Sequence, residues 1–156
     1  MRKRTNRKVW ALICPIKHAI EGACITSDED IGKLHQNELK SLDALINGKG
    51  DILSWHSMVT VNNLAQTLCG MGVGRAEVLP VCKLVEAELI EASRRYRDTK
   101  RMGLTGPGIQ HLRDLIEYHD LQRRSIPRSQ YEQAIRLTGA RIASGNATID
   151  LDKTLG

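Results

Sequence analysis

The sequence contains no phenylalanine, and tryptophan and tyrosine together make up only 3% of its 156 residues. Proteins that hold single-stranded nucleic acid by base stacking usually present several exposed aromatic rings on a sheet. The five rings of this chain are scattered through apolar segments, at Trp10, Trp55, Tyr96, Tyr118 and Tyr131. The composition therefore argues against an aromatic stacking platform.

Metal-binding cysteine patterns are also missing. The four cysteines, at positions 14, 24, 69 and 82, form no CxxC pair, and no histidine completes the spacing of a zinc finger. Cys69 and Cys82 stand among apolar residues, where a free cysteine behaves as a small hydrophobic side chain. We expect thiols buried in the core, and neither a metal nor another cofactor.

Long apolar runs are absent as well. The run VWALICPI, at positions 9–16, has eight residues and is followed at once by Lys17 and His18. A membrane helix needs about 20 apolar residues, and eight is at the short limit for the core of a secretion signal. We expect a cytoplasmic protein with no membrane association.

What the chain does have is a strongly basic beginning. The net charge is +5, and the first eight residues, MRKRTNRK, carry five positive charges and no negative one. The rest of the chain holds 18 basic and 18 acidic residues, so the body is electrically balanced. An electrostatic arm that binds an acidic partner is one interpretation, and a plain solvated tail is the other.

Cap residues and apolar spacing predict helices through the first half. Thr26 and Glu29 have capping-box spacing, and Asn47-Gly48 would end that helix. Asp51 can cap the next helix. Within that helix, residues 58–61 include a β-branched run that suits a strand equally well, so the choice between helix and strand stays open there. The 3-4-3 spacing of apolar residues beyond this run favours a helix. The expected apolar face is Met58, Val61, Ala65 and Leu68.

A longer apolar seam marks the fourth segment. Because proline is tolerated in the first turn of a helix, Pro80 places the helix start near Leu79. The spacing 4, 3, 4, 3, 4 requires a neighbouring helix, which either this chain or a second copy in a homodimer could supply. The seam consists of Val78, Cys82, Val85, Leu89, Ala92 and Tyr96.

Two further helices are expected, at about 109–124 and after Pro127. We considered a helix-turn-helix, since Arg136 and Arg141 on the last helix could reach base edges, but favour an antiparallel hairpin packed into the domain. The residues expected to share the apolar side of the last helix are Tyr131, Ala134, Ile135, Thr138 and Ile142.

These segments sum to an all-α protein. With a short first helix at 9–24, the prediction is a compact bundle of five or six helices with a basic N-terminal arm. Residues 1–8 would be the arm, 9–143 a single helical domain and 144–156 a C-terminal tail.

Catalytic motifs are scarce. The glycine-rich GMGVGR, at 70–75, follows no strand and has neither dinucleotide-loop nor Walker spacing, so we interpret it as a link between helices. The densest titratable cluster is HLRDLIEYHD, at 111–120, with His111, Asp114, Glu117 and His119. Its spacing separates glutamate from histidine on a helix, and a solvated face with ion pairs is the default interpretation. We therefore expect that the protein is not an enzyme.

A second basic run follows the apolar seam. On a continuous helix, Arg94, Arg97 and Arg101 would form one stripe, while Glu91 could pair with Arg95. Such a stripe could contact phosphates or an acidic partner together with the arm, or simply complement the helix dipole. The residues expected to bind nucleic acid or an acidic partner are thus Arg2, Lys3, Arg4, Arg7, Lys8, Arg94, Arg97 and Arg101.

Three stretches carry a family resemblance: RKR…RKVW…PIKHAIEGA, SWHSM and, above all, MGLTGPGIQHLRDLIEYHDLQRRSIPRSQYEQAI. They resemble small helical proteins of unassigned activity encoded in bacterial prophages and mobile elements. The resemblance spans most of the chain and implies a genomic setting, with no residue roles to carry over.

Two functions follow as hypotheses. The first is a non-enzymatic accessory protein that binds and blocks a host protein or nucleoprotein complex, in the manner of an anti-CRISPR or another defence inhibitor. The second is a sequence-tolerant DNA- or RNA-binding protein that uses the arm and the 94–101 stripe.

Overall fold

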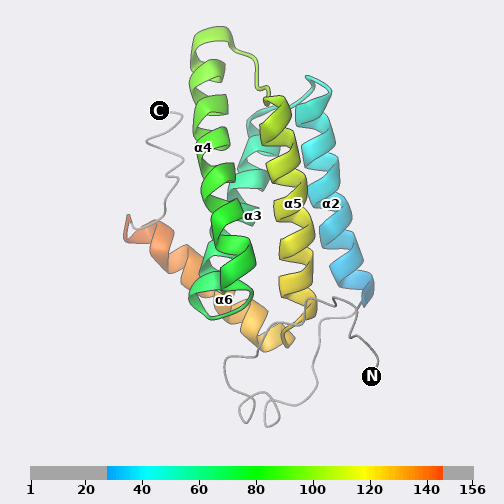
Figure 1. The fold of residues 1–156 in the computed structure, drawn as a ribbon, viewed down its shortest axis with the longest axis vertical. Coiled ribbons are helices and arrows are strands. Elements are labelled where there is room, and N and C mark those ends of the chain that lie inside the picture. Colours follow the sequence, from blue (N-terminus) through cyan, green and yellow to red (C-terminus); the bar gives the residue numbers. More distant parts are fainter. Residues whose placement is uncertain (1–27, 146–156) are drawn as a thin grey trace.

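A computed structural model describes residues 28–145 of the chain, and this region is all-helical (Figure 1). No strand occurs within it. The N-terminal arm, the 9–24 segment and residues 146–156 lie outside the described part. The helices are α2 (Asp28–Ile46), α3 (Ile52–Gly70), α4 (Arg75–Thr99), α5 (Gly106–Arg124) and α6 (Arg128–Ala143).

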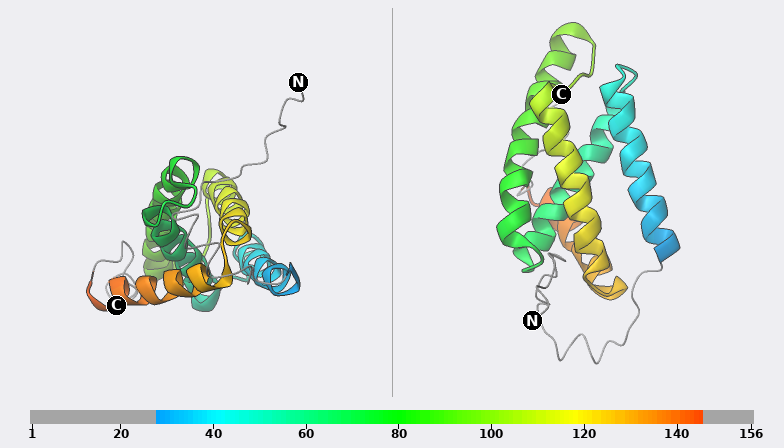
Figure 2. Two further views of the ribbon diagram at one scale, coloured as in Figure 1. Left: turned by 90° about the horizontal axis from the view of Figure 1, so that it is seen from below. Right: turned by 45° about the vertical axis from the view of Figure 1, so that its right-hand side comes forward.

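Helices α2 to α5 form an antiparallel four-helix bundle. Helices consecutive in sequence pack side by side, and α5 closes the ring against α2 (Figures 1 and 2). The fifth helix, α6, crosses the bundle and packs against α3. This differs from the expected antiparallel hairpin of the last two helices, because α6 turns away from α5 at Pro127.

Helix α3 is the centre of this arrangement, since it packs against α2, α4, α5 and α6. Residues 58–61 are helical, which settles the alternative between helix and strand. Met58, Val59 and Val61 are all buried. Packing on several sides thus outweighs the β-branched preference for a strand.

Two cap predictions are confirmed. The Asp51 carboxylate accepts a hydrogen bond from the Ser54 backbone N–H at 2.8 Å and so begins α3. At the other end of the preceding turn, α2 stops at Ile46 and Gly48 has φ of +70°, a left-handed conformation that glycine adopts without strain.

Helix α4 begins four residues earlier than expected, at Arg75 rather than near Leu79. Pro80 therefore lies inside the helix, and because it has no backbone N–H, the carbonyl group of Ala76 lacks its helical hydrogen bond. Both residues are exposed, so water can hydrate that carbonyl group. The prediction failed because it allowed proline only in the first turn.

The apolar seam of α4 is filled within one chain. Val78, Cys82, Val85, Leu89 and Ala92 are fully buried against the other helices of the bundle. Trp55 of α3 fixes the contact by donating its indole N–H to the Leu89 carbonyl oxygen at 2.9 Å. The seam therefore requires no second copy.

The expected apolar face of α6 is rotated. Ala134 and Thr138 are buried, as predicted, but Ile135 and Ile142 remain 50% and 48% exposed. The contact with α3 is partly polar, since the Thr138 hydroxyl donates to the Thr67 hydroxyl at 2.8 Å. Apolar spacing alone misplaced this face because the contact surface includes polar side chains.

No helix in the 28–145 region is long and apolar enough to cross a membrane.

The start of α5 depends on a close approach between Gly108 and Glu88 of α4. Thr105 caps the helix, and the Glu88 carboxylate accepts from the Thr105 backbone N–H at 2.7 Å and from its hydroxyl at 2.9 Å. A Cβ atom on Gly108 would collide with this carboxylate, whereas one on Gly106 would meet open space.

We predict that Gly108→Ala lowers the free energy of unfolding by about 1–3 kcal/mol, the usual cost of overpacking. The matched control, Gly106→Ala, should be neutral or up to about 1 kcal/mol more stable. Urea unfolding followed by circular dichroism measures both. Equal stability of the two variants would show that the Glu88 contact does not constrain the helix start.

Candidate partner interface

The basic stripe predicted for α4 is interrupted. The helix ends at Thr99, and Lys100 adopts a left-handed conformation with φ of 59°. Arg101 follows this turn, so only Arg94 and Arg97 share the helix. The prediction failed because nothing in the sequence before Gly103 signalled the helix end.

The expected pairing of Glu91 with Arg95 is also wrong. Arg94 forms the ion pair with Glu91, one helical turn away. Arg95 instead donates to the carbonyl oxygen of Gly103 at 2.8 Å and lies 3.4 Å from Glu88. Arg95 therefore stabilises the α4–α5 connection and does not contribute to the expected basic stripe.

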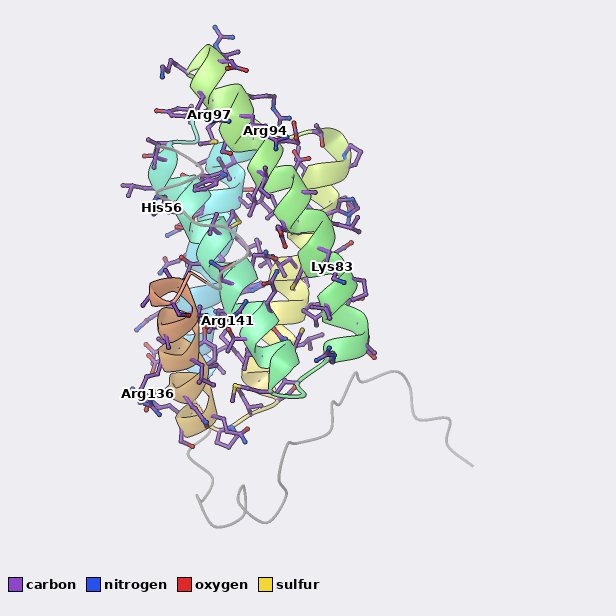
Figure 3. All side chains as sticks on the ribbon, turned by 90° about the vertical axis from the view of Figure 1, so that its left-hand side faces the viewer. His56, Lys83, Arg94, Arg97, Arg136 and Arg141 are labelled. Carbon is purple, nitrogen blue, oxygen red and sulfur yellow. The ribbon has the colours of Figure 1, made fainter. Side chains whose placement is uncertain are left out.

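Other cations gather on the same side of the molecule as Arg94 and Arg97. Figure 3 shows Lys83 and these two arginines along α4, at the right and top of the view. Arg136 and Arg141 lie on α6 at the lower left, and His56 of α3 lies above α6. We call the five lysine and arginine side chains the basic face: Lys83, Arg94, Arg97, Arg136 and Arg141.

Three members of the basic face have no neutralising partner. Lys83, Arg97 and Arg136 are exposed, and within 28–145 none of them forms an ion pair. Their positive charges are therefore available to an external partner. Glu91, paired with Arg94, and Glu86, next to Gln66, reduce the charge of this side only in part.

Arg141 is held in place by uncharged groups of α3. Its guanidinium group donates to the Thr67 hydroxyl at 2.7 Å and to the Gln66 side-chain oxygen at 3.3 Å. The Asn63 carbonyl oxygen lies 3.4 Å away. These contacts orient the guanidinium group without cancelling its positive charge, so that charge can still attract an anion.

Sequence reasoning placed Arg136 and Arg141 only in a rejected helix-turn-helix and missed Lys83. Lys83 and Arg97 are 14 residues apart, so the α4 part could have been found as a long-range helical stripe. The α6 part depends on how that helix crosses α3. The arm residues Arg2, Lys3, Arg4, Arg7 and Lys8 lie outside the described residues.

The 111–120 cluster is only partly a solvated face. Asp120 pairs with Arg124 at 2.9 Å, in keeping with the expected face of ion pairs, and Glu117 lies 3.4 Å from His35 of α2. His119 and Asp120, however, are buried together with Gln122 and Arg123. These four residues form a polar hub at the end of α5.

The hub connects α5 to the rest of the bundle. Gln122 donates to the carbonyl oxygens of Val73 at 3.0 Å and Ala65 at 3.2 Å, which joins α5 to α3 and the following turn. Arg123 forms a buried ion pair with Glu38 of α2. Burial outweighs the nearby Arg123 charge and raises the pKa of Glu38.

No group of three histidine, cysteine, aspartate or glutamate side chains in the described region is arranged to hold a metal ion. Cys69 and Cys82 are buried free thiols of the core, as predicted. The hydrogen bond that Cys82 donates to Cys69, together with burial, raises the pKa of the Cys82 thiol, which keeps it protonated. Cys14 and Cys24 are outside the region.

Comparison with known proteins gives no relative: no protein-family model matches the chain, and no curated protein or solved structure does so either.

His119 makes the hub sensitive to acid. Burial and the Arg123 charge lower its pKa from 6.5 to about 3, so the folded protein holds the imidazole neutral while the unfolded chain binds a proton. The unfolded state thus gains protons first as pH falls below 6.5. Glu38 has the opposite effect on stability: because its pKa is raised in the folded state, it favours folding as the pH falls.

We predict that His119→Gln flattens the pH dependence of stability between pH 6.5 and 3, where the parent histidine should cost about 1.4 kcal/mol per pH unit. Urea unfolding at half-unit pH steps measures the slope. The matched control is His111→Gln, on the same helix but only half-buried, which should retain the parental slope. An unchanged slope in His119→Gln would contradict the neutral, buried imidazole.

Proposed function

We propose that this protein is a non-enzymatic binding protein whose basic face occupies an acidic surface of a host protein or nucleoprotein complex and thereby blocks it. The observation that carries the proposal is that Lys83, Arg97 and Arg136 are exposed on one side without carboxylate partners. An anionic partner would neutralise charges that the described protein leaves unpaired.

The arrangement suits binding more than catalysis. Two helices, α4 and α6, contribute to the basic face, and both pack against α3, which holds them in fixed positions (Figure 3). Exposed Ile135 and Ile142 on α6 add apolar surface beside Arg136 and Arg141. Interfaces commonly combine arginine with apolar side chains in this way.

The sequence resemblance supports the biological setting within this proposal. Small helical proteins of prophages and mobile elements that lack a catalytic motif often act on a host complex, and an inhibitor of the anti-CRISPR kind fits that description. This is reasoning by analogy, whereas the basic face supports the binding role physically.

We predict that the triple variant Lys83→Glu, Arg97→Glu, Arg136→Glu loses the partner. Affinity capture from bacterial lysate, with identification by mass spectrometry, should show a protein or complex retained by the parent and lost by the variant. Affinity measured on that purified partner should fall at least about tenfold, because opposed charges become like charges.

The matched control is Lys40→Glu, Lys49→Glu, Arg113→Glu. These are exposed cations away from the basic face, and the net charge changes equally. The control should keep the partner. If both triple variants lose it to the same extent, only net charge matters and the basic face is not the interface.

Nucleic acid is the second candidate, favoured by the same unpaired cations, since phosphate contacts require no sequence-specific groups. We predict for this case that log K for duplex DNA falls against log salt with a slope of about −3.6 if Lys83, Arg97, Arg136 and Arg141 each contact a phosphate, at about 0.9 per contact. Fluorescence anisotropy with a DNA or RNA 20-mer measures it. Absence of binding at low salt would eliminate this candidate.

A further inference from the structure

A groove of about 400 Å³ lies between α2 and α3, separate from the proposed basic-face interaction. His119 and Arg123 of α5 and Tyr131 of α6 also line it. The volume is within the range of small-molecule sites, roughly 300–1,000 Å³. A stable protein interface, by contrast, needs about 800 Å² from each partner, so a small ligand fits this groove better.

The walls of the groove offer apolar surface that the described residues leave uncovered. Leu34 of α2 is 39% exposed and Leu53 of α3 is 73% exposed, and both line the groove with Val61 and Leu64. Covering such side chains removes apolar area from water, which favours a ligand with an aliphatic body.

The floor of the groove carries one negative and one positive group, Glu38 and Arg123. They are 8% and 3% exposed and form an ion pair through Glu38 Oε1 and Arg123 Nη2. Glu38 Oε2 and Arg123 Nε are buried without hydrogen-bond partners among the described residues. The floor therefore has one unused acceptor and one unused donor, which is costly at a buried site.

This pairing selects against charged ligands. Because Glu38 and Arg123 compensate each other, a charged head group would lose its hydration without gaining an unpaired counter-charge. The lining residues include no other carboxylate, lysine or arginine. His119 is neutral because its pKa is about 3, and burial raises the pKa of Tyr131, so that side chain is also uncharged at neutral pH. A neutral head group that donates and accepts would match the floor.

We propose that this groove binds a small amphipathic molecule with an aliphatic body and an uncharged head group of the carboxamide type. Glu38 Oε2 and Arg123 Nε have almost no accessible surface in the described structure, so the head group reaches them only when the two side chains turn toward the groove. It then donates to Glu38 Oε2 and accepts from Arg123 Nε. The aliphatic body lies against Leu53 and Leu64.

Titration calorimetry at pH 7 with octanamide, octanoate and octylamine tests the head group, because the three probes share nearly the same body. Octanamide should bind at least about tenfold more tightly than either charged probe, a difference of about 1.4 kcal/mol. Equal affinities, or no detectable octanamide binding, would overturn the proposal.

Thr60→Trp tests the location. Thr60 is exposed and lines the groove, so the indole should fill it and abolish octanamide binding, while Asp43→Trp, exposed on α2 outside the lining, should bind as the parent does. Circular dichroism verifies folding, and Ser57→Trp replaces Thr60→Trp if needed.

Methyl NMR distinguishes the groove from the other exposed apolar surface. Octanamide should shift the methyl signals of Leu53 and Leu64. Shifts confined to Ile135 and Ile142 of α6 would place the molecule elsewhere and overturn the proposal, as would unchanged octanamide binding in the tryptophan variant. All of these results are independent of partner capture by the basic face.

Discussion

The buried ion pair between Glu38 and Arg123 joins the first described helix of the bundle to the fourth. Burial of a charge is tolerated only when an opposite charge accompanies it, and removing one partner of such a pair commonly costs about 3–5 kcal/mol. The pair therefore fixes how α2 lies against α5. The same two side chains line the α2–α3 groove, so the ion pair that positions α2 against α5 also sets the charge at the floor of that groove.

Polar contacts likewise decide where α6 lies. Thr138 and Arg141 attach it to Thr67 of α3, while Ile135 and Ile142 stay half exposed. Had the helix rotated to bury both isoleucines, Arg141 would have lost its three neighbours on α3. The attachment thus brings two arginines of the last helix to the same side as the cations of α4, which is the origin of the basic face (Figure 3).

The basic face and the groove occupy different sides of α3 and meet near His56, which lines the groove and is visible beside the basic face. Their chemistry differs: the first is cationic and exposed, the second largely apolar with a balanced floor. The proposed partner and the proposed small ligand would therefore bind to separate surfaces of one bundle. Helix α3, packed on several sides, holds both surfaces in place.

Local patterns determined the helical class, the caps at Asp51 and Gly48, and the buried seam of α4, because these depend on residues within a few turns of one another. Only tertiary structure decided the start of α4, the rotation of α6, the polar hub at 119–123 and the placement of Lys83 and Arg136 on one side of the molecule. In the sequence, a buried arginine such as Arg123 looks the same as an exposed one such as Arg97. What separates them is whether another helix supplies a carboxylate, and that depends on packing between segments far apart in the chain.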